Sequence, residues 1–140
     1  MNKLKDVAHD CNLQCEYCFA SKGDYHQGQS LMTADTAMKA IDFLVRNSER
    51  QNLEIDFFGG EPLLNFQVVK VAVAYGRQVE QGSGKKLHFT ITTNGTLLDG
   101  PTIDYINQNI DNIVISIDGR KETHDAMRFY PGGKGTYDRI

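Results

Sequence analysis

Apolar residues recur along this chain with two different periods, and the changes of period divide it into short elements. Residues 4–8 form a short run that predicts a first strand. After a loop over residues 23–30, apolar side chains recur every three or four positions from 37 to 45, which predicts a helix with Thr33 as its N-cap. Residues 53–58 then predict a strand, which a pair of glycines ends.

The second half of the chain repeats this order. Residues 66–79 return to the helical period, and the glycines of residues 82–84 end that helix. Residues 87–93 are rich in β-branched side chains and predict a strand, whereas residues 99–101 have the Asp and Pro that begin a short helix. Residues 113–117 are almost continuously apolar, as buried parallel strands are.

The predicted order is therefore strand, helix, strand, helix, strand, helix, strand. Such alternation predicts an α/β fold made of right-handed βαβ units, with a parallel sheet and helices on at least one face. Binding residues of these folds gather beyond the C-terminal ends of the strands. Each predicted strand is followed by an unusual polar or glycine-containing group, and the four groups are the cysteine loop and residues 59–62, 93–95 and 116–119.

Chain length changes the picture of the domain. The chain has 140 residues, enough for one modest domain but fewer than the roughly 250 residues of a complete eight-stranded barrel. Residues 135–140 look like the beginning of a helix, and a fourth strand without a neighbour would leave backbone groups unpaired. We expect residues 1–140 to be a fragment of a longer barrel.

Charge and hydropathy exclude several classes of function. The net charge is −3 with scattered basic residues, which does not favour nucleic-acid binding. No window approaches 18 continuous apolar residues, and Met1 is not followed by an apolar signal segment, so neither a membrane nor secretion is expected. We therefore expect a reducing cytoplasm, in which cysteines bind metals as thiolates.

The three cysteines of the chain, Cys11, Cys15 and Cys18, have the spacing CxxxCxxC. Their odd number disfavours a disulfide. Two metal sites remain open from the residues alone: an iron–sulfur cluster with one iron left for another ligand, or a structural zinc with His9 or His26 as the fourth ligand. The absence of a second cysteine pair favours the cluster.

Residues 59–62, with the sequence Gly-Gly-Glu-Pro, are the second informative group. The two glycines permit close approach of the backbone, and Pro62 restricts Glu61 to an extended conformation. Its carboxylate would suit a ligand's ammonium group. The alternative is an ordinary turn between a strand and a helix.

Polar residues near the fourth strand also have two interpretations each. Ser116 and Asp118 would point the same way if the strand continued and would then hold sugar hydroxyls, or they belong to an Asp-Gly turn. His124, Asp125 and Arg128 have helical spacing, which indicates an ion pair on an exposed helix face. Arg128 would instead suit bidentate binding of a carboxylate.

Three further residues lie beside these groups. Tyr17 and Phe19 belong either to the core or to a shield over the metal site, where they would stack on a flat ring, and the core is favoured for Phe19. Asn94 is either a turn residue or a ligand contact.

Together these motifs resemble the radical S-adenosylmethionine enzymes, whose cysteine loop has an aromatic residue before its last cysteine, as Tyr17 is here. Residues 59–62 match the GGEP motif of that superfamily. Residues 92–98, 116–119 and 124–128 are similar to its peptide- and protein-modifying branch, which carries a cysteine-rich SPASM-type extension.

Within that branch, residues 18–25 and 53–63 resemble maturases that form thioether crosslinks in the SCIFF class of cysteine-rich peptides. Sulfatase-maturating enzymes are the next most similar group. The resemblance implies a partial TIM barrel, of which this chain has the first strands.

The resemblance also implies the site residues. Cys11, Cys15 and Cys18 would bind three irons of a [4Fe-4S] cluster, and the fourth iron would bind S-adenosylmethionine. Glu61 would contact its amino group and Arg128 its carboxylate. The full implied set of S-adenosylmethionine contacts is Tyr17, Gly59, Gly60, Glu61, Asn94, Ser116, Asp118 and Arg128.

By the same resemblance, the protein would cleave S-adenosylmethionine reductively and form a 5′-deoxyadenosyl radical for modification of a peptide. The implied partners are a cysteine-rich ribosomal peptide and an electron donor such as flavodoxin or ferredoxin. Formylglycine formation in sulfatases and a non-catalytic metal-binding module are the alternatives. The later strands and the SPASM-type cysteines are absent, so we expect the chain alone to bind a cluster poorly and to modify no peptide.

Overall fold

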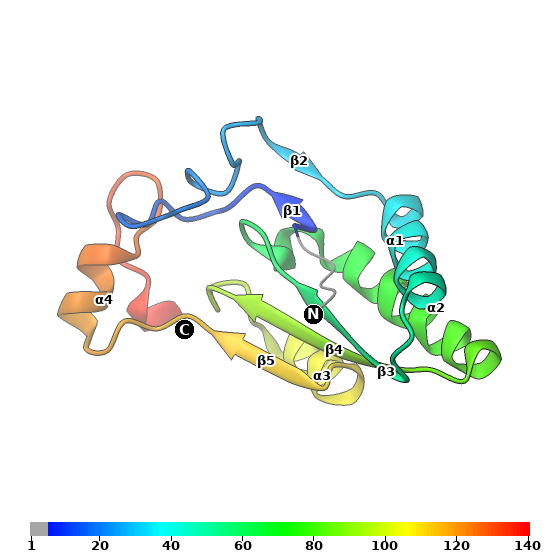
Figure 1. Cartoon of the computed structure of the whole chain (residues 1–140). Helices are drawn as coiled ribbons and strands as arrows, with labels where there is room; N and C mark the ends of the chain where they lie inside the picture. The colour runs from blue at the N-terminus through cyan, green and yellow to red at the C-terminus, as the bar shows by residue number, and fades with distance from the viewer. Residues whose placement is uncertain (1–5) are drawn as a thin grey trace.

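A computed structural model describes residues 6–140. Strands and helices alternate along most of the chain (Figure 1). In chain order the elements are β1 (Ala8–His9), β2 (Ser30–Leu31), α1 (Ala34–Asn47), β3 (Asn52–Phe57), the short 3-10 helix η1 (Pro62–Asn65), α2 (Phe66–Ser83), β4 (Lys86–Thr93), α3 (Gly100–Asn109), β5 (Asn112–Ile115), α4 (Lys121–Met127) and the 3-10 helix η2 (Tyr137–Arg139). None of the helices within residues 6–140 is long and apolar enough to span a membrane.

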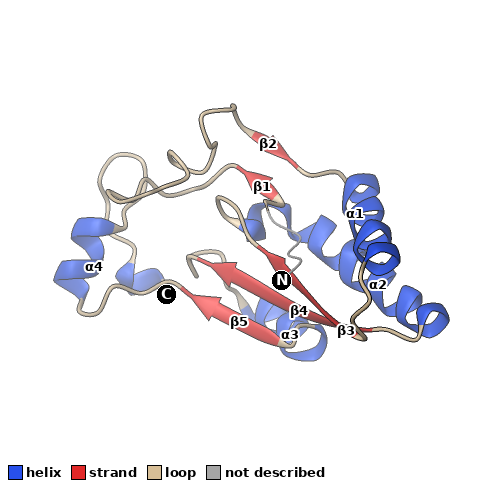
Figure 2. Cartoon of the chain, in the orientation of Figure 1, coloured by secondary structure: helices blue, strands red, loops and turns tan. Residues whose placement is uncertain are grey.

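Strands β3, β4 and β5 form a parallel sheet in that order, which confirms the predicted α/β class. Their C-terminal ends point toward the same part of the molecule, the part that also holds the loop after β1 (Figure 2). Helices α1 and α2 pack on each other, and α2 also packs on β4. One core joins these elements, with the rings of Phe57 and Phe89 stacked at 5.9 Å.

The helix ends follow from the residues that cap them. Thr33 Oγ1 accepts a hydrogen bond from the Thr36 N–H at 3.2 Å, as predicted for the start of α1. Asp99 Oδ1 does the same for the Thr102 N–H at the start of α3, at 2.9 Å. Helix α2 is longer than the predicted residues 66–79, because the glycine that stops it in a left-handed conformation is Gly84.

The predicted first strand is only partly present. Residues 4 and 5 of the predicted range lie outside the described residues, and β1 covers Ala8 and His9 alone. It pairs antiparallel with β2, a strand that the sequence did not predict. Ala8 also forms a parallel bridge with Gly59, and the Val7 N–H donates to the Phe58 carbonyl at 2.9 Å. Residues 7–8 therefore run parallel to residues 58–59, immediately after the end of β3.

Strand β5 is not buried, and the expectation drawn from its apolar sequence was wrong. All four of its residues are exposed, with Val114 at 44%. The strand pairs with β4 along one edge, and no other described strand pairs with its second edge. It also ends at Ile115, so residues 116–118 do not continue the strand.

Candidate functional site

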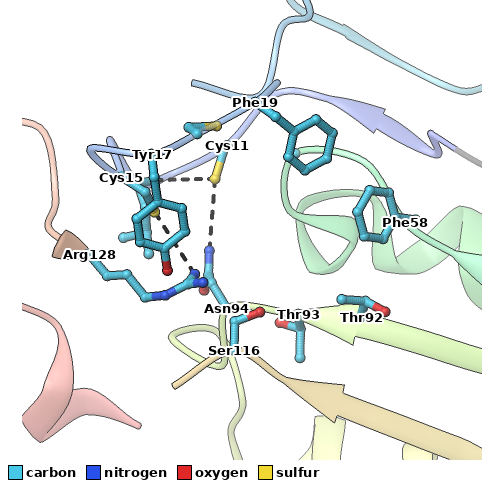
Figure 3. A pocket seen from close by; sticks show the side chains of 13 residues that line it. Cys11, Cys15, Tyr17, Phe19, Phe58, Thr92, Thr93, Asn94, Ser116 and Arg128 are labelled. Atoms are coloured by element: carbon cyan, nitrogen blue, oxygen red, sulfur yellow. Dashed lines mark hydrogen bonds between the residues drawn. The ribbon is translucent and has the colours of Figure 1, made fainter. Parts of the chain in front are cut away.

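The three cysteines lie on the loop after β1, beside a cavity of about 120 Å³ (Figure 3). All three are free and partly buried. The ends of three parallel strands meet them across the cavity. The residues from those strand ends that line it are Phe58 and Gly60 after β3, Thr92, Thr93 and Asn94 at β4, and Ser116 after β5.

The glycines after β3 hold the cysteine loop against the sheet. The Gly60 N–H donates to the Ala8 carbonyl at 2.7 Å, and the Glu61 N–H donates to the Asp10 carbonyl at 2.8 Å. Gly59 has φ +136°, and a Cβ there would lie 2.4 Å from the Ala8 oxygen. A Cβ on Gly60 would lie 2.0 Å from the Asp10 oxygen. Both positions therefore require glycine, because the loop that carries the cysteines passes directly over them.

Glu61 is fully buried behind the cavity and does not line it. Its Oε1 accepts hydrogen bonds from the Leu63 N–H at 3.0 Å and the Thr93 hydroxyl at 2.7 Å. Its Oε2 accepts from the Asn94 N–H at 2.8 Å. Burial raises the pKa of this carboxyl above its usual value, although the three hydrogen bonds act in the opposite direction. The side chain therefore joins the ends of β3 and β4.

Asn94 is both a turn residue and part of the cavity lining. Its Nδ2 donates to Asn12 Oδ1 at 2.9 Å and lies 3.9 Å from Cys11 Sγ. Its Oδ1 accepts from the N–H and the hydroxyl of Thr96, and that hydroxyl in turn accepts from Asn12 Nδ2. This closed set of hydrogen bonds connects the turn after β4 to the cysteine loop.

On the opposite side, Arg128 lines the cavity and forms an ion pair with Asp118. Arg128 Nε donates to Asp118 Oδ2 at 3.0 Å, and the Tyr17 hydroxyl donates to the same oxygen. The guanidinium lies over the Tyr17 ring at 5.2 Å, and Nη1 is 4.0 Å from Cys15 Sγ. Its outer nitrogens therefore face the cysteine side, as the close-up shows (Figure 3).

Three of the predicted placements are corrected by the structure. Phe19 is not in the core: it is 74% exposed and stacks on Phe58 at 6.0 Å beside the cavity. His124 is fully buried, so residues 124–128 do not form a solvated ion pair on a helix face. Ser116 lines the cavity but Asp118 does not; β5 ends at Ile115, so the two residues do not share one face of a strand.

The sequence did not single out Leu13 or Phe58, and it included Thr92 and Thr93 only within residues 92–98 without giving them a role, yet all four line the cavity. The last two end β4 immediately before Asn94, so their place at a strand end was the available signal. Apolar Leu13 and Phe58 carry no such signal, since nothing in their side-chain chemistry separates them from core residues.

Burial disfavours the charged, thiolate form of two of the three cysteines. Burial raises the pKa of the Cys11 thiol to about 11, opposed by the hydrogen bond from the Leu13 N–H. Burial also raises the pKa of Cys15, and the Arg128 charge acts against it. No three His, Cys, Asp or Glu side chains of residues 6–140 are grouped around one metal-ion position. A cluster does not need such a group, because each thiolate binds a different iron.

The comparisons with known proteins agree with this donor set. The 4Fe-4S single cluster domain family matches residues 5–136. A solved structure of native anSMEcpe with bound AdoMet and Cp18Cys peptide superposes with a TM-score of 0.83 at 25% identity, over 98% of this chain and 36% of that one. The chain belongs to the radical S-adenosylmethionine superfamily. Its fold is thus a partial radical S-adenosylmethionine fold, and the predicted cofactors, a [4Fe-4S] cluster and S-adenosylmethionine, are confirmed.

Curated relatives support this membership and its SPASM-type branch. Uncharacterized protein MJ0907 of Methanocaldococcus jannaschii is 37% identical over 91% of this chain and 42% of its own length. Radical SAM cyclopropyl synthase TigE of Paramaledivibacter caminithermalis is 25% identical, over 84% of this chain and 27% of its own. A cysteine-type anaerobic sulfatase-maturating enzyme of Clostridium novyi is 27% identical, over 98% of this chain and 37% of its own length. The chain thus spans less than half of each relative.

Proposed function

We propose that this chain is the N-terminal part of a radical S-adenosylmethionine enzyme that modifies a peptide or protein. The observation that carries the proposal is the single cavity at which the cysteine loop faces the ends of β3, β4 and β5. A peptide substrate is supported by the sulfatase-maturating relative and by the peptide in the solved anSMEcpe complex. When bound, the cluster and S-adenosylmethionine would supply a radical that removes a hydrogen atom from the substrate.

The residues around the cavity would divide the binding of these cofactors. Cys11, Cys15 and Cys18 would hold three irons, and the outer nitrogens of Arg128 would bind the carboxylate of S-adenosylmethionine. Ser116 would hold the carboxylate or ribose side by its hydroxyl. Asp118 would act through Arg128, because its carboxylate already holds the guanidinium and the Tyr17 hydroxyl.

The amino group of S-adenosylmethionine would bind beside residues 59–61. Gly60 offers its backbone directly to the cavity. Glu61 Oε2 accepts one hydrogen bond, from Asn94, and would accept a second from the ligand if the side chains that bury it move aside. Asn94, whose backbone N–H bonds Glu61 and whose side-chain nitrogen lies 3.9 Å from Cys11 Sγ, would then contact the ligand from the turn after β4.

We also propose that later strands complete this site. A cavity of about 120 Å³ is much smaller than the roughly 300–1,000 Å³ of most small-molecule sites. The exposed apolar strand β5 lies next to it and would pair with a further strand. A SPASM-type extension would follow, by analogy with the longer relatives.

The proposed reaction is thioether crosslinking of a cysteine-rich ribosomal peptide in the cytoplasm, with an electron from flavodoxin or ferredoxin. Formylglycine formation is the second candidate, and the matches to a sulfatase-maturating enzyme and to anSMEcpe favour it specifically. The two reactions leave different products: a thioether crosslink removes two hydrogens from the peptide, whereas formylglycine formation at cysteine removes its sulfur.

Anaerobic reconstitution of the full-length protein tests the proposal. We expect iron and sulfide uptake, a change in the spectrum of the reduced cluster when S-adenosylmethionine is added, and formation of 5′-deoxyadenosine. Mass spectrometry of a cysteine-rich peptide and of a sulfatase peptide would then distinguish the two products. A site that takes up zinc, or a cluster whose spectrum ignores S-adenosylmethionine, would instead show a non-catalytic metal-binding module.

A further inference from the structure

His124 is the one buried side chain of helix α4, whose other residues are exposed or partly exposed. It does not line the cavity. Its ring makes two hydrogen bonds: Nδ1 accepts from the Asp118 N–H at 3.2 Å, and Nε2 lies 3.0 Å from Thr136 Oγ1. The Tyr137 ring packs against it edge-on at 5.7 Å. Both ring nitrogens of this buried imidazole therefore have hydrogen-bond partners, as buried polar groups usually do.

The hydrogen bonds assign one tautomer to the ring. Because Nδ1 accepts a hydrogen bond from an N–H, the proton of the neutral ring is on Nε2. The Nε2–H therefore donates to the Thr136 hydroxyl, and that hydroxyl donates to the Arg128 carbonyl at 2.9 Å. Every donor in this series has an acceptor. The series runs in one direction, from the backbone of Asp118 through His124 and Thr136 to the backbone of Arg128.

The two ends of this series are the two partners of the ion pair beside the cavity. Asp118 Oδ2 holds Arg128 Nε at 3.0 Å, and the guanidinium faces Cys15. His124 also accepts the Arg128 N–H on its own carbonyl, at 2.7 Å. The backbone positions of both partners thus depend on one residue, which lies outside the cavity that they serve.

We propose that His124 is a positioning residue for the S-adenosylmethionine site: through Nδ1 and through Thr136 it fixes the backbones of Asp118 and Arg128, and so aims the Arg128 guanidinium. The inference rests on the proposed binding of the S-adenosylmethionine carboxylate by Arg128. The positioning role also requires a hydrogen-bond acceptor at the place of His124 Nδ1, to receive the Asp118 N–H. Binding of the carboxylate by Arg128 does not by itself imply that acceptor.

Two substitutions of His124 distinguish the contributions of the hydrogen bonds at Nδ1 and at Nε2. In His124→Asn the side-chain oxygen lies near the position of Nδ1 and still accepts from the Asp118 N–H, whereas in His124→Gln the polar group lies near Nε2. Thr136→Val removes the hydroxyl and keeps the shape. His88→Gln is the matched control, because His88 is partly exposed and lies near Asp111, away from the cavity.

The variants are compared in the full-length, cluster-loaded protein by equilibrium binding of S-adenosylmethionine and by hydrogen exchange of the amides around Asp118. We expect His124→Gln and Thr136→Val to weaken binding by about tenfold, the loss expected for one buried hydrogen bond. Exchange at Asp118 should accelerate in His124→Gln only. His124→Asn should bind more tightly than His124→Gln, with equal iron content in all variants.

Equal affinity in the wild type, His124→Gln and Thr136→Val would overturn the positioning role and leave the proposed function intact. So would a His124→Gln variant that binds at least as tightly as His124→Asn. A wild-type protein that holds a cluster but does not bind S-adenosylmethionine would overturn the proposed function, and the positioning role with it.

Discussion

Glu61 illustrates, at the scale of single residues, how a buried carboxylate organises the cavity without lining it. Three donors converge on its two oxygens, from the turn at Leu63, from the Thr93 hydroxyl and from the Asn94 backbone. Burial disfavours the charge and raises the pKa of the group. The hydrogen bonds compensate for part of that cost, so the carboxylate acts as a joint between the ends of β3 and β4.

Substitution of Glu61 by Gln tests this joint. All three partners of the carboxylate are donors, so the amide NH₂ of Gln would face at least one of them. We expect Glu61→Gln to lower the free energy of unfolding by about 1–3 kcal/mol, the cost of leaving a buried donor unpaired. Urea unfolding measures this change in the free energy of unfolding. Substitution of the exposed Glu54 by Gln is the matched control. Equal stability of the two variants would contradict the assigned hydrogen bonds.

Substitution of each cysteine tests the metal site. Since Cys11, Cys15 and Cys18 are the only cysteines of the chain, no other thiolate of residues 1–140 can replace a lost one. We expect Cys11→Ala, Cys15→Ala and Cys18→Ala each to reduce iron bound per chain to about a tenth or less after anaerobic reconstitution, because cluster binding depends on every ligand. Ser21→Ala, on the same loop, is the control and should load normally. Full loading of any of the cysteine variants would remove that residue from the ligand set.

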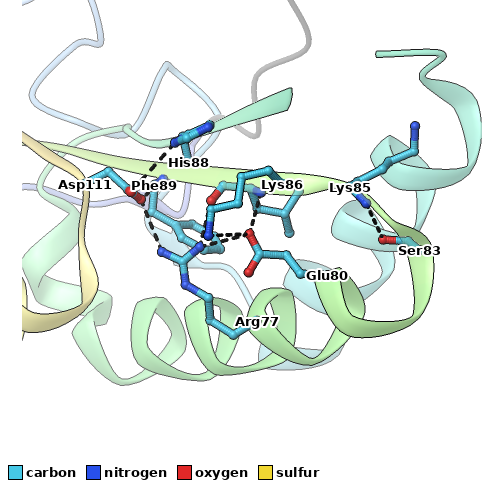
Figure 4. Close-up of polar contacts among 9 residues, drawn as sticks. Arg77, Glu80, Ser83, Lys85, Lys86, His88, Phe89 and Asp111 are labelled. Carbon is cyan, nitrogen blue, oxygen red and sulfur yellow. Dashed lines mark hydrogen bonds and ion pairs between the residues drawn. The ribbon is translucent and has the colours of Figure 1, made fainter. Parts of the chain in front are cut away.

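At the scale of elements, three charged side chains take the place of a strand beside the beginning of β4 (Figure 4). Strand β5 pairs with β4 only from Thr90 onward. Before that point the Leu87 N–H donates to Glu80 at 2.6 Å, its carbonyl accepts from Arg77 at 2.7 Å, and the Phe89 N–H donates to Asp111 at 2.8 Å. The edge of β4 is therefore covered by side chains where its neighbouring strand is missing.

This arrangement predicts an acid-sensitive contribution to stability. Burial alone would raise the pKa of Glu80, but the Leu87 hydrogen bond and the charges of Arg77 and Lys86 together hold it below the usual 4.5. A lowered pKa in the folded state gives stability that is complete above pH 4.5 and is lost as the pH falls through the folded value. Glu80→Gln should thus be less stable than wild type at pH 7, by about 1 kcal/mol.

The difference in stability between the wild type and Glu80→Gln should shrink below pH 4.5, where the wild-type carboxyl takes up its proton. Urea unfolding at pH 7 and at acidic pH measures the free energy of unfolding of both proteins. Substitution of the exposed Glu49 by Gln is the control. A difference between Glu80→Gln and wild type that does not change with pH would show that the charge of Glu80 contributes nothing.

At the scale of the whole molecule, periodicity predicted most of the fold. The spacing of apolar residues in α1, α2 and β4 located these elements, and strand ends located the cysteine loop, Gly60, Asn94 and Ser116 around one cavity. Strand β2 was not predicted, because a strand of two residues is too short to show a periodic pattern of apolar side chains.

Burial was predicted less well than the elements, because it depends on what packs against a side chain. Phe19 and β5 have the apolar character of a core but are exposed, whereas polar His124 and Glu61 are buried. Glu61 is satisfied partly by donors more than 30 residues away, Thr93 and Asn94, whereas His124 accepts from the Asp118 N–H and donates to the Thr136 hydroxyl. No local pattern contains that information, so the roles of Glu61 and His124 emerge only from the structure.

The open edge of β5 leads to the last prediction. Ile113, Val114, Ile115 and Ile117 are all exposed on or just after this strand, and an apolar strand edge without a partner favours pairing with another chain. We expect the 140-residue chain to self-associate as its concentration rises. Val114→Lys should weaken that association by about tenfold or more, since a charge on an edge strand opposes pairing.

Sedimentation velocity over a range of concentrations measures the self-association of the 140-residue chain. Ile103→Lys is the matched control, because Ile103 lies on α3 and is 43% exposed, nearly as much as Val114. If β5 is the contact, only Val114→Lys shifts the equilibrium toward monomer, because the α3 substitution leaves the strand edge unchanged. A wild-type chain that stays monomeric, or equal effects of the two lysines, would show that the exposed strand is no pairing surface.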